Sequence, residues 1–214
     1  MTAFLTGTYC ISMTISKKVG GIFFALVALG LFGAMTLAVE LSKEDGDRLE
    51  RKIDEIANNG ATSQPQPKRT PVSESEMNSY LNINFKQKIP KGLTNPEIAM
   101  LGNGALASRV LVDLDEFNRN RRPQGLMDPL AYLSGKVPVT ARGVLRAQDG
   151  KGRFQLGAAE IHGIALPKQV VQELVSYFSR TPDYPNGFDI DAPFDLPTKI
   201  REIAINKGEA IVVQ

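Results

Sequence analysis

The chain has 214 residues, of which 43% are hydrophobic, and its 25 Lys and Arg against 23 Asp and Glu give a formal net charge of +2. This balance gives no reason to expect a nucleic-acid partner, which favours a strongly basic face. Cys10 is the only cysteine and His162 the only histidine, so a disulfide within the chain and a thiolate metal site after residue 10 are excluded. We expect neither a metal nor a cofactor.

An uncharged apolar run, Val19–Val39, extends for about 21 residues near the start of the chain. At about 1.5 Å rise per residue, a helix of this length matches the roughly 30 Å hydrocarbon core of a bilayer. Lys17 and Lys18 precede the run, and acidic residues from Glu40 onward follow it. The positive-inside rule therefore predicts a cytoplasmic N-terminus (residues 1–18), an anchor in the cytoplasmic membrane, and a C-terminal domain that is periplasmic or extracellular.

The same run also has features of a cleaved signal. Thr36 and Ala38 are small residues at the spacing that a signal peptidase recognises, whereas the run is longer than the usual signal core of about 7–15 residues. The length favours an uncleaved anchor, and the sequence leaves both interpretations open.

Residues 40–57 have the pattern of a short amphipathic helix after the membrane. Ser42 and Asp45 form an imperfect capping box, and three apolar residues share one helical face: Leu49, Ile53 and Ile56. We expect a solvated stalk; a helix that lies on the membrane or pairs with a second copy is the alternative.

Residues 58–71 are rich in Gly, Pro and Gln and have no apolar period, which predicts a flexible linker. The exported domain is then expected to span residues 72–214. It begins with a helix that has Ser73 as its N-cap and Glu76 three residues later, and that ends before Pro90. Its apolar stripe consists of Met77, Tyr80, Leu81 and Phe85.

Alternating residues predict an antiparallel meander in the rest of the domain. Strands at 97–101 and 105–114 flank a Gly-Asn-Gly turn, and a long alternating strand over 136–148 returns as a second strand over 153–164. Strands well above the usual length of about 5–6 residues suggest a curved sheet. In the second long strand, unbroken alternation past Gly157 would put Glu160 and His162 on the buried face. A bulge near Gly157 would instead return Ile161 to it, and a glycine within a strand often marks such a bulge.

A helix is predicted to begin at Pro167 and to end before Pro182, and a terminal hairpin is predicted over 199–214. The predicted fold is therefore α+β: a curved antiparallel β-meander packed on one or two helices, preceded by a single N-terminal transmembrane helix.

None of the residues that carry chemistry forms a convincing catalytic set. His162 has no nucleophile near it in the sequence, so we expect a protein that is not an enzyme. Asp113 and Asp115 share one face at a strand end and could act as an acid/base pair, but the end of a strand is a common place for Asp. A loop with Asp183, Asp189, Asp191 and Asp195 lacks the glycine and glutamate of a calcium loop, so a solvated loop is favoured.

One arginine cluster could bind phosphate head groups, because guanidinium groups bridge phosphate oxygens. The alternative, which we favour, is a solvated loop balanced by neighbouring carboxylates. The cluster consists of Arg119, Arg121 and Arg122.

Four stretches together carry a resemblance to a known family: Ser73–Leu81, the hairpin Gly135–Ile164 with its Asp149-Gly150 turn, Gly163–Pro167, and Phe194–Pro197 before the terminal hairpin. Their layout resembles that of bacterial envelope proteins of the LmeA-like phospholipid-binding group, whose fold is similar to the tubular lipid-binding domains. The resemblance implies a curved antiparallel sheet that wraps a long helix and leaves an apolar groove for an acyl chain.

The apolar faces of the predicted elements allow either a closed core or such a groove. The leading hypothesis is a membrane-anchored, non-enzymatic envelope domain that binds or shuttles a lipid or another apolar ligand, with membrane lipid as its partner. The alternative is a structural or assembly module that recruits another envelope protein. The candidate groove residues are Val137, Val139, Leu145, Phe154, Leu156, Val171, Leu174 and Phe178.

Overall fold

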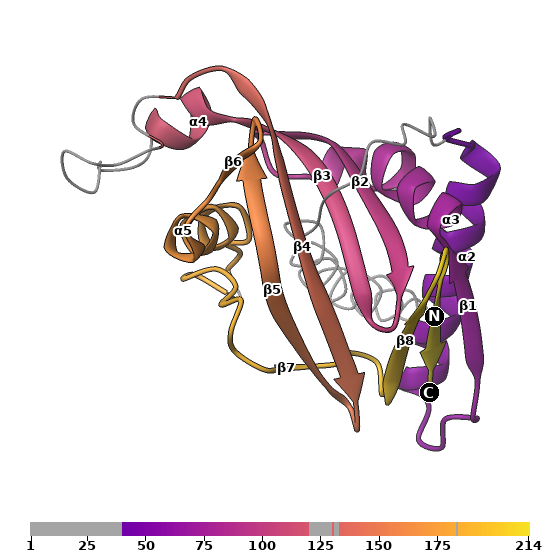
Figure 1. Cartoon of the computed structure of the whole chain (residues 1–214). Helices are drawn as coiled ribbons and strands as arrows, with labels where there is room; N and C mark the ends of the chain where they lie inside the picture. The colour runs from indigo at the N-terminus through magenta and orange to yellow at the C-terminus, as the bar shows by residue number, and fades with distance from the viewer. Residues whose placement is uncertain (1–39, 120–129, 131–132, 183) are drawn as a thin grey trace, which may run out of the picture.

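The computed structural model describes residues 40–119, 130, 133–182 and 184–214. The predicted transmembrane segment, Val19–Val39, lies outside these residues, and none of the helices within them is long and apolar enough to cross a membrane. The described chain is α+β, with two antiparallel sheets and helices packed against them (Figure 1).

The larger sheet is the predicted meander. Its neighbouring strands follow the chain in the order β2-β3-β4-β5-β6, and a short strand, β7, pairs with the start of β5. The long strands curve as they cross the molecule (Figure 1). Their bounds are β2 Leu93–Gly102, β3 Ala105–Asp113, β4 Lys136–Gln148, β5 Lys151–Ile161, β6 Ile164–Ala165 and β7 Phe194–Asp195.

The β4-β5 hairpin confirms the period of two that the sequence predicted. Asp149 and Gly150 both have positive φ, as a type I′ turn requires. In β5 the register shifts at Gly157, which has no partner in β4. This bulge turns Ile161 inward, where it is 2% exposed, so the predicted bulge is also confirmed.

The smaller sheet contains the predicted terminal hairpin and one strand that the sequence did not predict. Its order is β1-β9-β8, with β1 Arg69–Ser73, β8 Glu202–Asn206 and β9 Glu209–Val213. The first three residues of β1, 69–71, fall within the predicted linker, which is wrong for that segment. Thr70 and Val72 are buried, but an alternation of only two residues beside Pro71 is too short to be recognised in the sequence.

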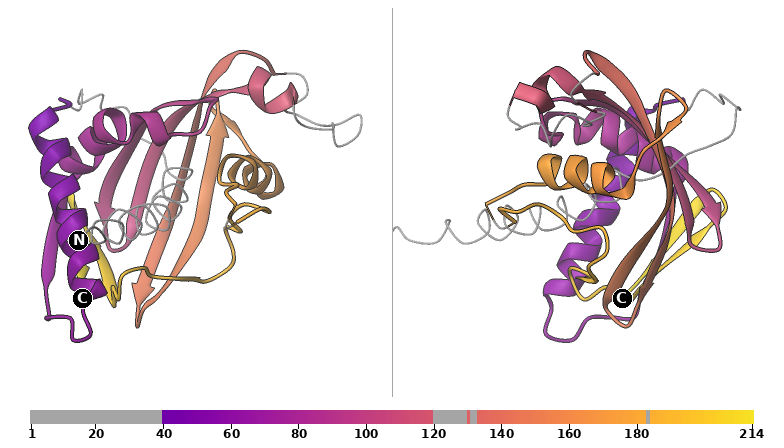
Figure 2. Two further views of the ribbon diagram at one scale, coloured as in Figure 1. Left: turned by 180° about the vertical axis from the view of Figure 1, so that it is seen from behind. Right: turned by 60° about the vertical axis from the view of Figure 1, so that its left-hand side comes forward.

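Helix α2, Lys43–Ala61, packs into the domain instead of standing as the expected solvated stalk. Its predicted face is buried in the main core, with Leu49 at 1% and Ile56 at 7% exposure. Lys52 fixes the helix to the next segment, because its Nζ donates to both carboxylate oxygens of the buried Glu76 at 2.7 Å. The helix is therefore part of the folded unit (Figure 2).

The next helical segment confirms the predicted capping box and covers the edge of β2. It consists of α3 Glu74–Ser79, a π-helical turn η1 Tyr80–Asn84 and a 3₁₀ turn η2 Lys86–Lys88. Asn78 donates to the carbonyl of Ile98 at 2.8 Å and accepts from its N–H at 2.7 Å. The carboxylate of Glu74 accepts from the N–H of Met100 at 2.7 Å. These side chains take the place of a neighbouring strand.

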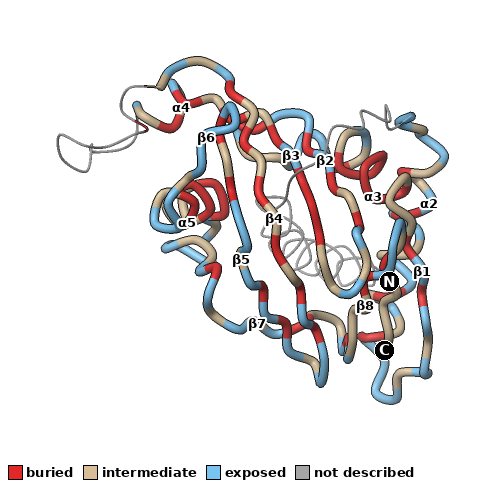
Figure 3. The backbone as a smooth tube through the Cα atoms, in the orientation of Figure 1, coloured by how far each residue is buried: buried red, intermediate tan, exposed pale blue. Residues whose placement is uncertain are grey.

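Helix α5, Lys168–Phe178, lies against the other end of the larger sheet, and α4, Leu114–Arg119, follows β3 (Figure 1). One apolar face of α5 is buried, as the spacing of its apolar residues predicts: Val171, Leu174, Val175 and Phe178. Buried apolar residues form two clusters, one around α2 and both sheets and one around α4 and α5. Figure 3 shows the buried backbone along β3, β4 and these helices.

Candidate functional site

An apolar cavity of about 90 Å³ lies between α2, the smaller sheet and the ends of β2, β3 and β4. Among its lining residues only Thr198 has a polar side chain. The others are Leu49, Ile53, Ile56, Val72, Met77, Ile98, Met100, Leu106, Leu145, Pro197, Ile200, Ile203, Ile205, Ala210 and Val212.

Each wall follows from a local pattern in the sequence. The i, i+4 and i+7 spacing of Leu49, Ile53 and Ile56 directs one face of α2 towards the cavity. In the terminal hairpin, Ile203 and Ile205 are two residues apart on one strand and therefore point to the same side. The two sheets thus both supply walls of one apolar space.

Thr198 is the polar exception in the wall. The backbone of Thr198 has φ 54°, and its side-chain Oγ1 is buried without a hydrogen-bond partner among the described residues. The carbonyl of Thr198 accepts from Nε2 of Gln214 at 2.7 Å, and α2 approaches the same carbonyl so closely that a Cβ at Gly60 would lie 2.1 Å from it. This loop is therefore held tightly on the backbone side.

A second, more polar space of about 300 Å³ separates the two sheets, and we call it the inter-sheet slot. Strand β3 pairs with β4 only as far as Val144, so Leu145–Gln148 have no β3 neighbour. Glu202–Ile205 of β8 line the opposite side. Gly104 bridges one end, because its N–H donates to the carbonyl of Ile205 at 3.2 Å and its carbonyl accepts from Leu145 N–H at 2.8 Å.

The inter-sheet slot and the apolar cavity are neighbours. Leu145, Ile203 and Ile205 line both of them. At the far end of the slot, the N–H of Gly150 donates to the carbonyl of Arg201 at 3.0 Å. Three apolar side chains therefore separate a polar opening from an apolar interior.

Of the eight predicted groove residues, only Leu145 lines the apolar cavity beside α2. Seven of the eight are buried and Leu156 is half-buried. They are divided between the clusters: Leu145, Leu156, Phe154 and Val171 pack in the main core, and Val137, Val139, Leu174 and Phe178 pack around α4 and α5. The structure therefore places the apolar cavity at the other end of the sheet's buried face from the space expected under α5.

The predicted head-group cluster lies far from the cavity. Arg119 is exposed at the end of α4 and donates to the carboxylate of Glu116 at 2.7 Å. Arg121 and Arg122 fall outside the described residues. In both Figure 1 and Figure 2, α4 and the smaller sheet lie at opposite ends of the molecule, so Arg119 cannot reach a ligand in the cavity.

The histidine and the aspartates considered as catalytic or metal-binding residues lie in a turn, at a helix cap or in ion pairs with lysines. His162 is exposed in the tight turn between β5 and β6, with φ 50°. Asp113 accepts from the N–H of Glu116 at 3.0 Å and thereby caps α4. Asp191 and Asp195 pair with Lys168 and Lys151. Within the described ranges, no group of His, Cys, Asp or Glu side chains could hold a metal ion.

Sequence reasoning missed the walls that α2 and the smaller sheet provide. The amphipathic pattern of α2 was recognised, but the partner of its apolar face was not. A signal was present in Val72, Ala210 and Val212, apolar residues on two strands that pair with each other. Their pairing joins positions more than 130 residues apart, which no local period can reveal.

Comparison of the chain with models of protein families, with curated proteins and with solved structures gives no match.

Proposed function

We propose that this chain is a membrane-anchored, non-enzymatic envelope protein whose domain binds a lipid or another apolar ligand in the cavity beside α2. The observation that carries the proposal is the cavity's lining, in which fifteen of sixteen residues are apolar. Burying apolar surface is favourable by about 25 cal/mol per Å², so an alkyl group would be more stable there than in water. The anchor at Val19–Val39 would hold the domain next to its lipid source.

The size of the cavity limits what it holds at rest. An engineered apolar cavity of about 150 Å³ stays dry and binds benzene. At about 90 Å³ the cavity beside α2 accommodates only a short part of an alkyl chain. A longer chain requires the walls to separate. The inter-sheet slot is where they can do so, because β4 and β8 are joined there only at its two ends.

The test is native mass spectrometry with lipid extraction on the full chain purified from a bacterial envelope. Ala210 lines the cavity and is 5% exposed, so Ala210→Leu fills the space with three further carbons. The matched control is Ala158→Leu, the same enlargement at an exposed position of β5. We expect a bound apolar molecule in the parent and the control and its loss in Ala210→Leu. Absence of any bound apolar molecule from the parent chain, or its retention in Ala210→Leu, would refute the proposal.

A second candidate function, recruitment of another envelope protein, is favoured by one open strand edge. Strand β5 pairs with β7 through Lys151 and Gly152 and with β6 through Glu160 and Ile161. Between these pairs, Arg153–Ala158 have no paired strand on that side among the described residues. An extended partner segment could add there as a further strand.

Site-specific photocrosslinking tests this candidate. A photoreactive residue at Gln155 should capture one partner in the envelope, whereas one at Val144, the register partner of Gln155 inside the sheet, should not. Equal capture from both positions would argue against strand addition at β5.

A further inference from the structure

The outer face of the β4-β5 hairpin brings two arginines together. Arg146 and Arg153 are register partners, so their Cβ atoms lie about 4.5–5.5 Å apart on the same face of the sheet. Both side chains are exposed, and neither forms an ion pair or hydrogen bond within the described part of the chain. Like charges directly opposite each other destabilise a sheet. A bound anion would convert this repulsion into two attractions.

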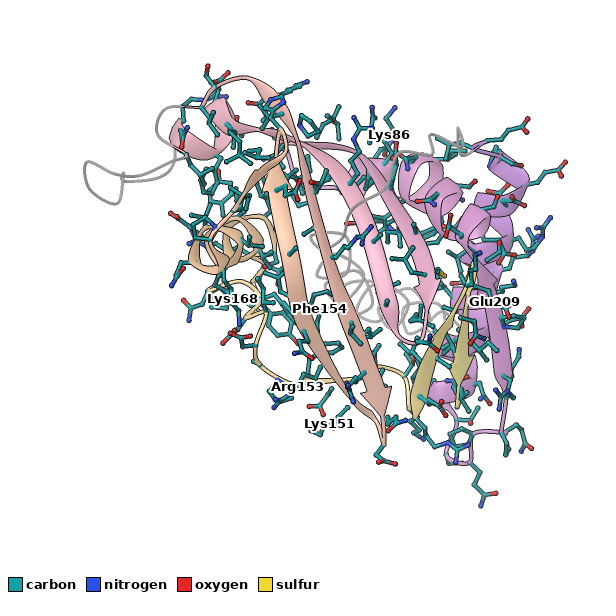
Figure 4. All side chains as sticks on the ribbon, in the orientation of Figure 1. Lys86, Lys151, Arg153, Phe154, Lys168 and Glu209 are labelled. Atoms are coloured by element: carbon teal, nitrogen blue, oxygen red, sulfur yellow. The ribbon has the colours of Figure 1, made fainter. Side chains whose placement is uncertain are left out.

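Two nearby cations on this face have a carboxylate as their neighbour in place of a second cation. Lys151, two residues before Arg153, pairs with Asp195. Arg109, on the same outer face, stands in register with Glu97. Figure 4 shows Arg153 and Lys151 beside the end of the hairpin. Among the register pairs of β2 to β5, Arg146 and Arg153 are the pair in which two cations stand directly opposite each other.

Arg146 also lines the inter-sheet slot, whose inner boundary is formed by the side chains that line the apolar cavity. The slot lies at the free edge of β4, where β3 is absent, and Leu145, Ile203 and Ile205 lie between it and the cavity. A chain that displaced these side chains would pass from the outer face of the sheet to its buried face. An occupant with a charged end at the arginines and an alkyl chain could follow this route past Leu145 and Ile203.

We propose that Arg146 and Arg153 form the head-group site for a single-chain amphiphile with an anionic oxygen head, whose alkyl chain passes through the inter-sheet slot into the apolar cavity. This inference rests on the proposed function, because it uses the same cavity. Arg146 and Arg153 donate to the carboxylate or phosphate oxygens, for which the guanidinium fork is well suited. Glu202 lines the slot opposite Arg146 and opposes an anion, which makes it a specificity residue that weakens binding.

The experiment measures equilibrium binding of radiolabelled dodecanoate and dodecanol to the purified full chain. Ala210→Leu supplies the background, since it fills the cavity. We expect Arg146→Gln and Arg153→Gln each to weaken dodecanoate binding roughly 10-fold and dodecanol binding less than about 2-fold. Glu202→Gln should tighten dodecanoate roughly 2- to 3-fold, since it removes one like charge. The matched control, Arg109→Gln, should leave both ligands unaffected.

The outcomes separate this inference from the proposed function. If neither ligand binds above background, the apolar site itself fails. If both bind but Arg146→Gln weakens them equally, or leaves dodecanoate unchanged, the cavity stands and the head-group site is wrong. Acetate has the head without the chain and should not compete at millimolar concentration. Competition by acetate as strong as that by dodecanoate would show a site for small anions and would also overturn the inference.

Discussion

Asn78 allows the most direct test of how this fold protects the edge of its larger sheet. The side chain is 0% exposed, and it makes two hydrogen bonds to one residue of β2, donating to the carbonyl of Ile98 at 2.8 Å and accepting from its N–H at 2.7 Å. Ile98 is itself only 5% exposed. Asn78→Ala therefore leaves a buried donor and a buried acceptor without partners.

Each orphaned buried group costs about 1–3 kcal/mol, so we expect Asn78→Ala to lower the free energy of unfolding by about 3–5 kcal/mol. This is a large share of the roughly 5–15 kcal/mol typical of a folded domain. Urea unfolding of the full chain followed by circular dichroism measures the loss, which should appear as a lower midpoint at an unchanged m-value.

The control is Asn82→Ala in the next turn. Asn82 is half-buried and donates one hydrogen bond to β2, to the carbonyl of Pro96 at 2.7 Å. Its loss should cost about 1 kcal/mol. If Asn78→Ala cost no more than Asn82→Ala, the side chain of Asn78 would not be substituting for a neighbouring strand, and the reasoning would be wrong.

Two further predictions concern α2 and the segment that it covers. Gly60→Ala should destabilise the fold by about 1–3 kcal/mol despite the better helix propensity of Ala, because the new Cβ would lie 2.1 Å from the backbone carbonyl of Thr198. Gly46→Ala is the comparison, since its nearest contact is the side chain of Asn84, which can move; thermal unfolding should show the smaller loss there. Burial, with a smaller contribution from Glu50 and Asp54, raises the pKa of Tyr80 to about 12 from its ordinary value of about 10. Below pH 10 the Tyr80 hydroxyl is neutral in the folded and the unfolded state. As the pH rises from 10 to about 12, the hydroxyl ionises first in the unfolded chain, so the free energy of unfolding should fall by about 1–2 kcal/mol. Urea midpoints measured across that pH range should show this decline in the parent chain and not in Tyr80→Phe.

The sequence predicted those parts of the fold in which neighbours along the chain are neighbours in space. The period of two in β4 and β5, the bulge at Gly157 and the stripe of α5 all depend on local spacing, and the structure confirms them. Strand β1 was missed because it is defined by pairing with β9, more than 130 residues away. The role of α2 was missed for the same reason: its apolar face was visible, but the surface that covers it was not.

The candidate site shows the same division. Leu145, Phe154 and Leu174 were correctly expected to face inward, yet an inward face is needed equally for a filled core and for a cavity. Whether a filled core or a cavity forms depends on which side chains the surrounding helices and strands bring together. Around α4 and α5, Phe117, Tyr177 and Phe178 pack with ring centroids 4.9–6.0 Å apart. The wall beside α2 contains no aromatic residue and consists mainly of Leu, Ile, Val and Met.

That difference in composition explains the position of the apolar cavity. Aromatic rings are large and fill the space between a helix and a curved sheet, whereas branched aliphatic side chains on three separate elements leave a residual gap. The gap lies where β3 stops short of the end of β4 and a second sheet continues the wall. The same break in the sheet creates the inter-sheet slot, so one topological feature places an apolar cavity and a polar slot side by side.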